Sequence, residues 1–131
     1  MRVFGAHLEN VGTDSVINMQ APRPLWSCYV DGVEIEPFEY TGNSWLFCHS
    51  NSLIDGPHTI TVNVTVTNNQ TFWFDRIEYV PSPGVSLANK VISVDSPDPA
   101  MKFSDGWIDY VQIGNWTQTL NAVFAMNFYG M

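Results

Sequence analysis

The feature that most constrains the fold of this chain is the alternation of apolar and polar side chains from His58 to Thr67, HTITVNVTVT. Every second residue is isoleucine or valine, and threonine or asparagine stands between them. Because successive side chains of a strand point to opposite faces, this pattern predicts a half-buried β-strand. The polar turn 68–70 follows, and then a run rich in aromatic and β-branched residues, Thr71 to Val80. We therefore predict a β-hairpin.

One acidic residue interrupts the apolar face of the second predicted strand. Asp75 stands at the same alternate positions as Trp73, Ile77 and Tyr79, so it is expected to point in the same direction as these side chains. A carboxylate that is removed from water needs a hydrogen-bond or charge partner, because its desolvation is costly. The pattern therefore predicts an inward Asp75 with a partner.

The rest of the chain also has the pattern of strands. Asp31-Gly32 is a hairpin dipeptide, and it is expected to turn strand 25–30 into strand 33–35. No segment of ten or more residues shows a convincing 3.6-residue period. Further extended segments are expected at residues 3–9, 16–19, 44–49, 85–94, 101–110 and 121–130. The predicted fold is all-β, a two-sheet antiparallel β-sandwich formed by residues 1–131 as one domain.

The charge composition argues against two classes of partner. The chain has 13 acidic and 5 basic residues, a net charge of -8, and no cluster of lysine or arginine. Nucleic acids and anionic membranes both attract basic surfaces, so neither is an expected partner. No apolar stretch approaches the roughly 20 residues that a membrane-spanning helix needs, and no membrane insertion is expected.

The two cysteines, Cys28 and Cys48, lie near the middles of two predicted strands. A disulfide between them is expected if the protein is exported. The alternative is two buried free thiols that pack as small apolar side chains. Their isolated positions, without nearby histidine, do not suit a zinc site.

Three Asn-X-Ser/Thr sequons begin at Asn63, Asn69 and Asn115. Each is a candidate for N-glycosylation. Together with the cysteines they favour an extracellular, secreted protein. Residues 1–12 lack the charged and apolar regions of a signal peptide, so a leader is expected to be absent from this chain.

Several segments together resemble a known family. They are WSCYVDG, NSWLFC, DGPHTITVNV, FWFDRIEYVP and VDSPDPAMKFSDGW. The set is similar to the galactose-binding-like jelly rolls found among carbohydrate-binding modules. It is most similar to the extracellular jelly-roll proteins of mushroom-forming fungi, which often carry two such modules in tandem. The resemblance covers nearly the whole chain and implies a secreted fungal β-sandwich.

The order of the segments is shifted relative to that family. Residues 1–80 resemble the later part of a module, residues 81–85 resemble a linker, and residues 86–131 resemble the opening part. The chain is therefore either circularly permuted or cut from mid-module to mid-module of a tandem pair. Strand 121–130 is expected beside or in line with the first strand. A swapped homodimer is the alternative to a monomer.

The resemblance also implies a structural calcium ion. Members of the broader group often hold calcium between the first strand and the last. Asp75 matches the late acidic ligand, and Asp95 or Asp98 lies where the early ligand is expected. Carboxylate oxygens suit calcium, although a hydrogen-bonded surface Asp75 beside Arg76 is an equal alternative.

Tryptophans provide the candidate sugar site. Sugars are held by aromatic rings against their apolar faces, with amides and carboxylates on their hydroxyls. Trp26, Trp45, Trp107 and Trp116 stand beside polar or turn residues. The last two are the preferred candidates because polar side chains surround them, among them Asp105 and Asn115. Each ring alone is also compatible with a place in the core or at its rim.

The sequence does not predict an enzyme. The three histidines are scattered, and neither G-x-S-x-G nor H-E-x-x-H occurs. The expected function is a non-catalytic, lectin-like module with a glycan ligand. The alternative is a structural or adhesion domain that makes protein contacts.

Overall fold

The computed structural model describes residues 1–9, 25–36, 46–51, 53–67, 70–87, 90–110 and 114–131. These residues form strands and connecting turns, and none of them lies in a helix that could cross a membrane. The strands are β1 (Arg2–Glu9), β2 (Leu25–Val30), β3 (Val33–Ile35), β4 (Leu46–His49), β5 (Gly56–Thr65), β6 (Gln70–Tyr79), β7 (Ile92–Asp95), β8 (Met101–Phe103), β9 (Trp107–Tyr110), β10 (Gly114–Thr117) and β11 (Asn121–Gly130). The predicted all-β class is confirmed.

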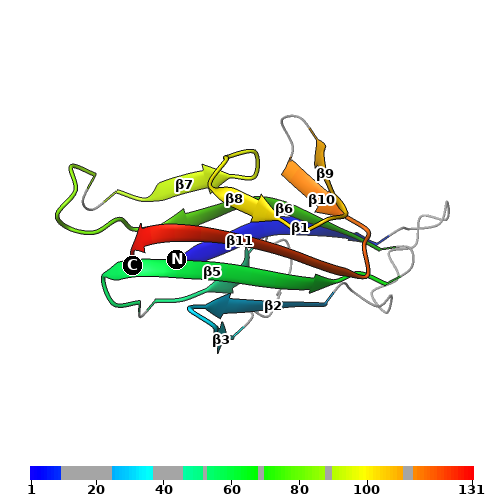
Figure 1. Ribbon diagram of the computed structural model, residues 1–131, viewed down its shortest axis with the longest axis horizontal. Helices are drawn as coiled ribbons and strands as arrows, with labels where there is room; N and C mark the ends of the chain where they lie inside the picture. Colours follow the sequence, from blue (N-terminus) through cyan, green and yellow to red (C-terminus); the bar gives the residue numbers. More distant parts are fainter. Residues whose placement is uncertain (10–24, 37–45, 52, 68–69, 88–89, 111–113) are drawn as a thin grey trace.

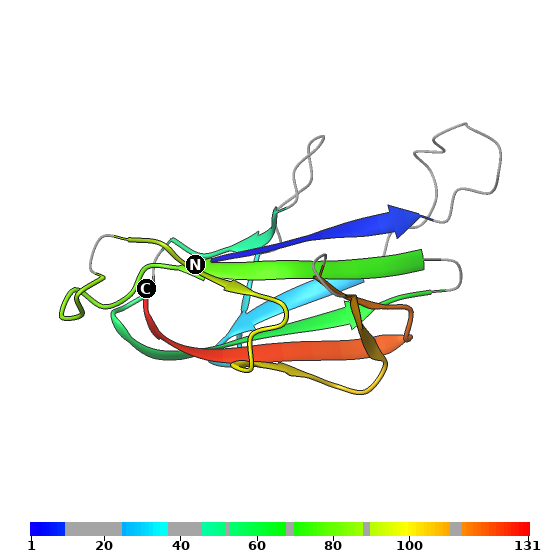
Figure 2. The ribbon, with the colours of Figure 1, turned by 90° about the horizontal axis from the view of Figure 1, so that it is seen from above.

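The strands form two antiparallel sheets that pack face to face (Figures 1 and 2). Sheet A has the order β4-β1-β6-β10-β9, and β7 pairs with the second half of β6. Sheet B has the order β3-β2-β5-β11-β8. Figure 2 shows β1 and β6 in one layer and β5 and β11 in the other. The predicted two-sheet β-sandwich is therefore confirmed.

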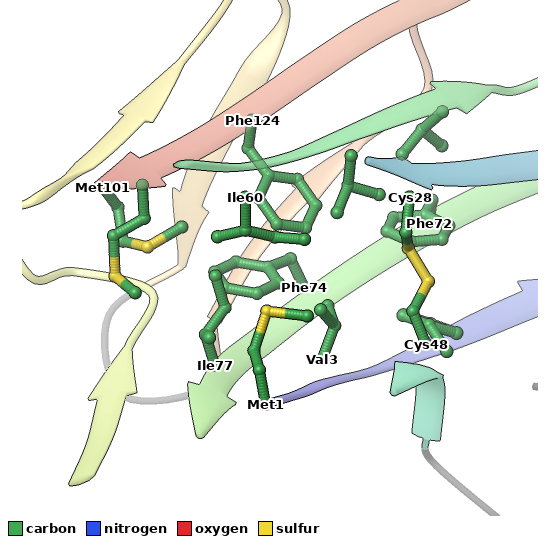
Figure 3. Close-up of a cluster of buried hydrophobic side chains, with 14 of the residues drawn as sticks. Met1, Val3, Cys28, Cys48, Ile60, Phe72, Phe74, Ile77, Met101 and Phe124 are labelled. Carbon is green, nitrogen blue, oxygen red and sulfur yellow. A yellow bond between two sulfur atoms is a disulfide. The ribbon is translucent and has the colours of Figure 1, made fainter. Parts of the chain in front are cut away.

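The core fills the space between the sheets (Figure 3). Ile60, Val62 and Val64 are buried on β5, as their alternation predicts. Phenylalanines meet across the layers, since the rings of Phe74 on β6 and Phe124 on β11 have centroids 4.1 Å apart. Burial of such a ring contributes on the order of 2 to 3 kcal/mol to stability.

The predicted hairpin between β5 and β6 is wrong. Both strands are present, but β5 lies in sheet B between β2 and β11, and β6 lies in sheet A between β1 and the strands β10 and β7. The chain therefore crosses from one sheet to the other between them. The apolar face of β5 and the apolar face of β6 therefore meet across the core and bury each other. In a hairpin the two faces would lie next to each other in one sheet.

The predicted inward direction of Asp75 is also wrong. Phe4 of β1 pairs with Arg76, and the next residue, Gly5, pairs with Phe74, so Asp75 is an extra residue on β6. Such a β-bulge reverses the alternation of side chains beyond it. Phe74 and Ile77 are consequently both fully buried although three positions separate them. The Asp75 side chain is about half exposed and pairs with Arg76.

The disulfide between Cys28 and Cys48 is confirmed. Cys28 lies on β2 of sheet B and Cys48 on β4 of sheet A, so the bond joins the two layers (Figure 3). Both residues are fully buried. The bond is therefore a covalent tie through the core.

The last third of the chain belongs to the same two sheets. β7, β9 and β10 extend sheet A, and β8 and β11 extend sheet B. Strand β11 is not beside β1, because its partners are β5 and β8. Its end nevertheless lies close to the start of β1 at one end of the sandwich, as the two marked termini show (Figures 1 and 2).

The first residues of segment 81–85, which resembles a linker, pack against the sandwich. Pro81 forms a β-bridge with Gly130, and Val80 and Met131 exchange two backbone hydrogen bonds of 2.9 and 2.7 Å. Ser82 is buried, and its hydroxyl bonds to Asp55. The chain is exposed from Pro83 to Leu87.

The predicted strand 101–110 is two strands in different sheets. β8 pairs with β11 in sheet B, and β9 pairs with β10 in sheet A. Gly106 between them has a φ of 90°, a conformation that favours glycine. The Gly106 carbonyl accepts hydrogen bonds from the hydroxyls of Thr117 and Thr119, at 2.9 and 3.2 Å. The turn at Ser104-Asp105-Gly106 is therefore the point where the chain changes layers.

Candidate functional site

Two of the candidate tryptophans pack into the core. The Trp26 indole nitrogen donates to the Phe47 carbonyl at 3.1 Å, and the centroids of the two rings are 4.8 Å apart. The Trp107 ring stands edge-on to Phe72 and Phe124, with centroid distances of 6.2 and 5.5 Å. Both tryptophan side chains are half-buried and pack against the core. Trp45 lies outside the described residues.

Two other tryptophans lie on the outer face of sheet A. Trp116 of β10 pairs directly with Trp73 of β6, and both neighbours of Trp73 on β6, Phe72 and Phe74, are fully buried. Since strand side chains alternate, Trp73 and Trp116 point away from the core. Their ring centroids are 5.9 Å apart and their planes are inclined by 35°. Both side chains are half-buried.

The pair extends into a row that crosses three strands. Ile108 of β9 pairs with Trp116 and is 49% exposed. We call Ile108, Trp116 and Trp73 the aromatic row. The short β9–β10 hairpin, which carries two of its members, is seen at the upper right of Figure 1. The row is an apolar strip on the outer face of sheet A.

Charged groups flank the row along β6. The Arg76 Nε donates to Glu78 Oε1 at 2.9 Å, and Arg76 Nη1 pairs with Asp75. The Arg76 guanidinium also lies over the Phe4 ring, 4.2 Å from its centroid. The hydrogen bond to Glu78, with a further one to Asp75, raises the pKa of Arg76. The guanidinium therefore stays charged. Its two carboxylate partners lie two and five residues after Trp73, and their side chains are 47% and 19% exposed.

An amide lies on the other side of Trp73. The Gln118 side-chain nitrogen donates to the Thr71 hydroxyl at 2.9 Å. Thr71 is buried, whereas Gln118 is exposed. The aromatic row thus has hydrogen-bonding groups at both ends of the β6 segment that carries Trp73.

The predicted site residues are only partly brought together. Trp116 belongs to the aromatic row, and Asp105 is exposed in the turn between β8 and β9. Asn115 faces the interior and is 7% exposed, and no described residue is hydrogen-bonded to its side-chain oxygen. Trp73 was not predicted as a site residue. In the sequence it stands at the same alternate positions as the buried Ile77, and the bulge at Asp75 between them places the two side chains on opposite faces of β6.

The three carboxylates expected to bind calcium have other partners. Asp75 pairs with Arg76, Asp95 Oδ1 accepts from Ser93 at 3.3 Å, and Asp98 Oδ1 accepts from the Ala100 backbone at 2.8 Å. Within the part of the chain that the structure describes, no three acidic, histidine or cysteine side chains gather into a metal cluster. The described geometry thus lends the calcium prediction no support.

Comparisons give no family. Neither known protein families, nor curated proteins, nor solved structures match the chain significantly. The functional argument therefore depends on the site itself.

The sequence does not predict the hydrogen bonds that His58 makes at the start of β5, which we call the histidine clamp. His58 Nδ1 is 2.6 Å from Asp31 Oδ2, and His58 Nε2 is 2.6 Å from the Ile54 carbonyl oxygen. Both partners accept hydrogen bonds, so both ring nitrogens donate only when the ring is protonated. The hydrogen bonds to Asp31 and then to Ile54 raise the pKa of His58. The clamp ties the β2–β3 turn to the start of β5.

A cavity of about 260 Å³ lies where the two chain ends meet. Its walls are mainly apolar, including Leu53, Tyr79 and Val91, and Arg2 and Glu78 supply charge. Among its lining residues no two rings are side by side, as they are in the aromatic row. We therefore regard the aromatic row as the better candidate for recognition of a sugar.

Proposed function

We propose that the chain is a non-catalytic carbohydrate-binding module and that a glycan lies on the aromatic row. The observation that supports this proposal is the sorting of the four described tryptophans. Trp26 and Trp107 pack against the core, while Trp73 and Trp116 stand together on the outer face of sheet A. Rings that the core does not use are typical of recognition surfaces.

The chemistry of the row fits a pyranose. One side of a sugar ring presents aliphatic C–H groups, which pack on indole faces, while its rim of hydroxyls needs donors and acceptors. Asp75, Arg76 and Glu78 on one side and Gln118 on the other offer such groups. Two ring contacts of about 1 kcal/mol each with a few hydrogen bonds give an affinity on the order of millimolar.

The resemblance to carbohydrate-binding jelly rolls is consistent with this proposal. We further propose that the protein works outside the cytosol, because structural disulfides persist in oxidising compartments. The Cys28–Cys48 bond supports that location.

A glycan array followed by titration tests the function. The wild-type chain is expected to show saturable binding, and Trp73→Ala and Trp116→Ala are each expected to weaken it at least tenfold. Tyr129→Ala is the matched control, because Tyr129 is an exposed aromatic on the outer face of sheet B. Circular dichroism verifies that each variant is folded.

Two results would contradict the proposal. The first is a blank array with folded protein, which favours a structural or adhesion domain. The second is glycan binding that survives both tryptophan substitutions, which places the ligand elsewhere.

A further inference from the structure

The described residues at the centre of the outer face of sheet B carry no charge. Side chains at alternate positions of β2, β5 and β11 point to solvent there, and those described are Leu25, Ser27, Tyr29, Thr59, Thr61, Asn63, Thr65, Asn121, Val123, Ala125, Asn127 and Tyr129. None is acidic or basic. Among the described residues, charged side chains border the face, as Glu34 of β3, Lys102 of β8 and Asp31 of the β2–β3 turn, whose carboxylate accepts from the Thr59 backbone at 2.8 Å.

This face also exposes apolar groups. Leu25 is 71% exposed and Val123 is 36% exposed. Charged side chains normally protect a sheet surface from association with other chains, because bringing them together in an interface is costly. A face of small hydroxyl, amide and methyl groups has no such protection.

A sequon stands at the middle of this face. Asn63 pairs with Ser27 of β2 on one side and with Val123 of β11 on the other. Asn63 is exposed, and Thr65, the third residue of the sequon, points to the same side. The neighbours that surround the Asn63 amide are small, so a bulky substituent on its nitrogen meets no obstruction from them.

We propose that Asn63 carries an N-linked glycan and that this glycan covers the charge-free face of sheet B. The donor is a lipid-diphosphate-linked oligosaccharide in a eukaryotic secretory pathway. The Asn63 side-chain nitrogen forms a bond to the anomeric carbon, the bond from that carbon to the diphosphate breaks, and the lipid diphosphate leaves with the electron pair. The amide proton passes to a base of the transferase.

The fold distinguishes Asn63 from another sequon of the chain. Glycans are attached before folding is complete, so the folded protein must leave the modified nitrogen outside. Asn115 is in the interior opposite Phe74, and a glycan there is incompatible with the described packing. Asn69 lies outside the described residues. The strongly hydrated sugar at Asn63 supplies the solubility that charges supply elsewhere on the surface.

Secretion from a eukaryotic host behind a cleavable leader tests the assignment. The intact mass is expected to fall after N-glycanase treatment, and the peptide with residue 63 is expected to gain the mass of an Asn-to-Asp conversion. Thr65→Val is expected to abolish the modification at this peptide, and Thr65→Ser is expected to keep it. Asn69→Gln removes any second glycan from the mass balance.

The covering role has its own measurement. Light scattering of the secreted protein before and after N-glycanase treatment is expected to show self-association only after the glycan is removed. Folded, secreted protein with an unmodified Asn63 would overturn the assignment. Equal association of the two forms would overturn the covering role. The mass readout is independent of glycan binding at the aromatic row, and repeating the scattering measurement with Trp73→Ala keeps such binding out of the association readout.

Discussion

Reduction of the Cys28–Cys48 disulfide is expected to lower stability by an amount set by the loop that it closes. The two cysteines are 20 residues apart. The chain-entropy relation for such a loop gives about 3.3 kcal/mol at 25 °C. For 131 residues the entropy of unfolding is roughly 0.28 kcal/mol/K, so the melting temperature is expected to fall by about 12 °C.

The assay is thermal unfolding of oxidised and reduced protein. Both cysteines are fully buried, so the bond should be reduced in denaturant and the protein refolded with reductant present. Reduction leaves both cysteine side chains in the protein. The change in melting temperature therefore reports the loss of the covalent bond and not the loss of side-chain packing. The double variant Cys28→Ala/Cys48→Ala is the control, and reductant is expected to leave its melting temperature unchanged.

The reasoning would be refuted if the reduced wild-type protein melted within about 3 °C of the oxidised form. That result would mean that the unfolded chain gains little freedom when the bond opens. The unfolded state would then keep structure between the two cysteines.

Two further predictions follow from the described contacts, and a third tests the calcium ion expected from the resemblance. Since its pKa is raised, His58 stabilises the fold fully below its ordinary pKa of 6.5, and this stabilisation is lost as the pH rises through the raised value. Since the pKa of Asp31 is lowered, its stabilisation is complete above 3.8 and is lost as the pH falls through the lowered value. Thermal melts should therefore show an advantage of wild type over His58→Gln that is largest between these values and becomes smaller in alkaline buffer, where the neutral ring donates only one of the two hydrogen bonds. An advantage of equal size at neutral-to-acidic and at alkaline pH would contradict the clamp. Gly5→Ala should destabilise by about 1 to 3 kcal/mol in urea unfolding, because its Cβ would lie 2.1 Å from the Trp73 carbonyl oxygen, whereas Gly56→Ala, with open space, should be near neutral. The calcium prediction requires a lower melting temperature in chelator that Ca²⁺ restores, and an unchanged melt would remove it.

Local patterns were sufficient to predict most strands. The alternation along β5 and β11 and the Asp31-Gly32 turn depend on neighbouring residues alone, and in the structure Asp31 and Gly32 have φ values of 53° and 79°. The crossing from β5 to β6 could not be predicted in this way. The same two amphipathic strands can be joined by a turn within one sheet or by a turn that crosses between sheets. The local sequence pattern is the same in both cases.

The candidate site was predicted less well for a related reason. The outward direction of Trp73 depends on the bulge at Asp75, which is defined only by the pairing of β6 with β1. Gly5 of β1 lies at this point against the Phe47 ring, and that contact involves segments more than 40 residues apart in the chain. Trp107 and Trp116 have similar polar neighbours in sequence, and only their places in the sheet register put the first ring against the core and the second on the outer face of sheet A.

The crossing between β5 and β6 also has a kinetic consequence. Because these consecutive long strands do not pair, β5 must find β2 and β11, and β6 must find β1 and β10, across large separations in sequence. Closing such loops costs entropy before any contact repays it, which slows the search for the native topology. The chain is expected to fold in milliseconds to seconds, with its sheets completed only when the last strand, β11, arrives.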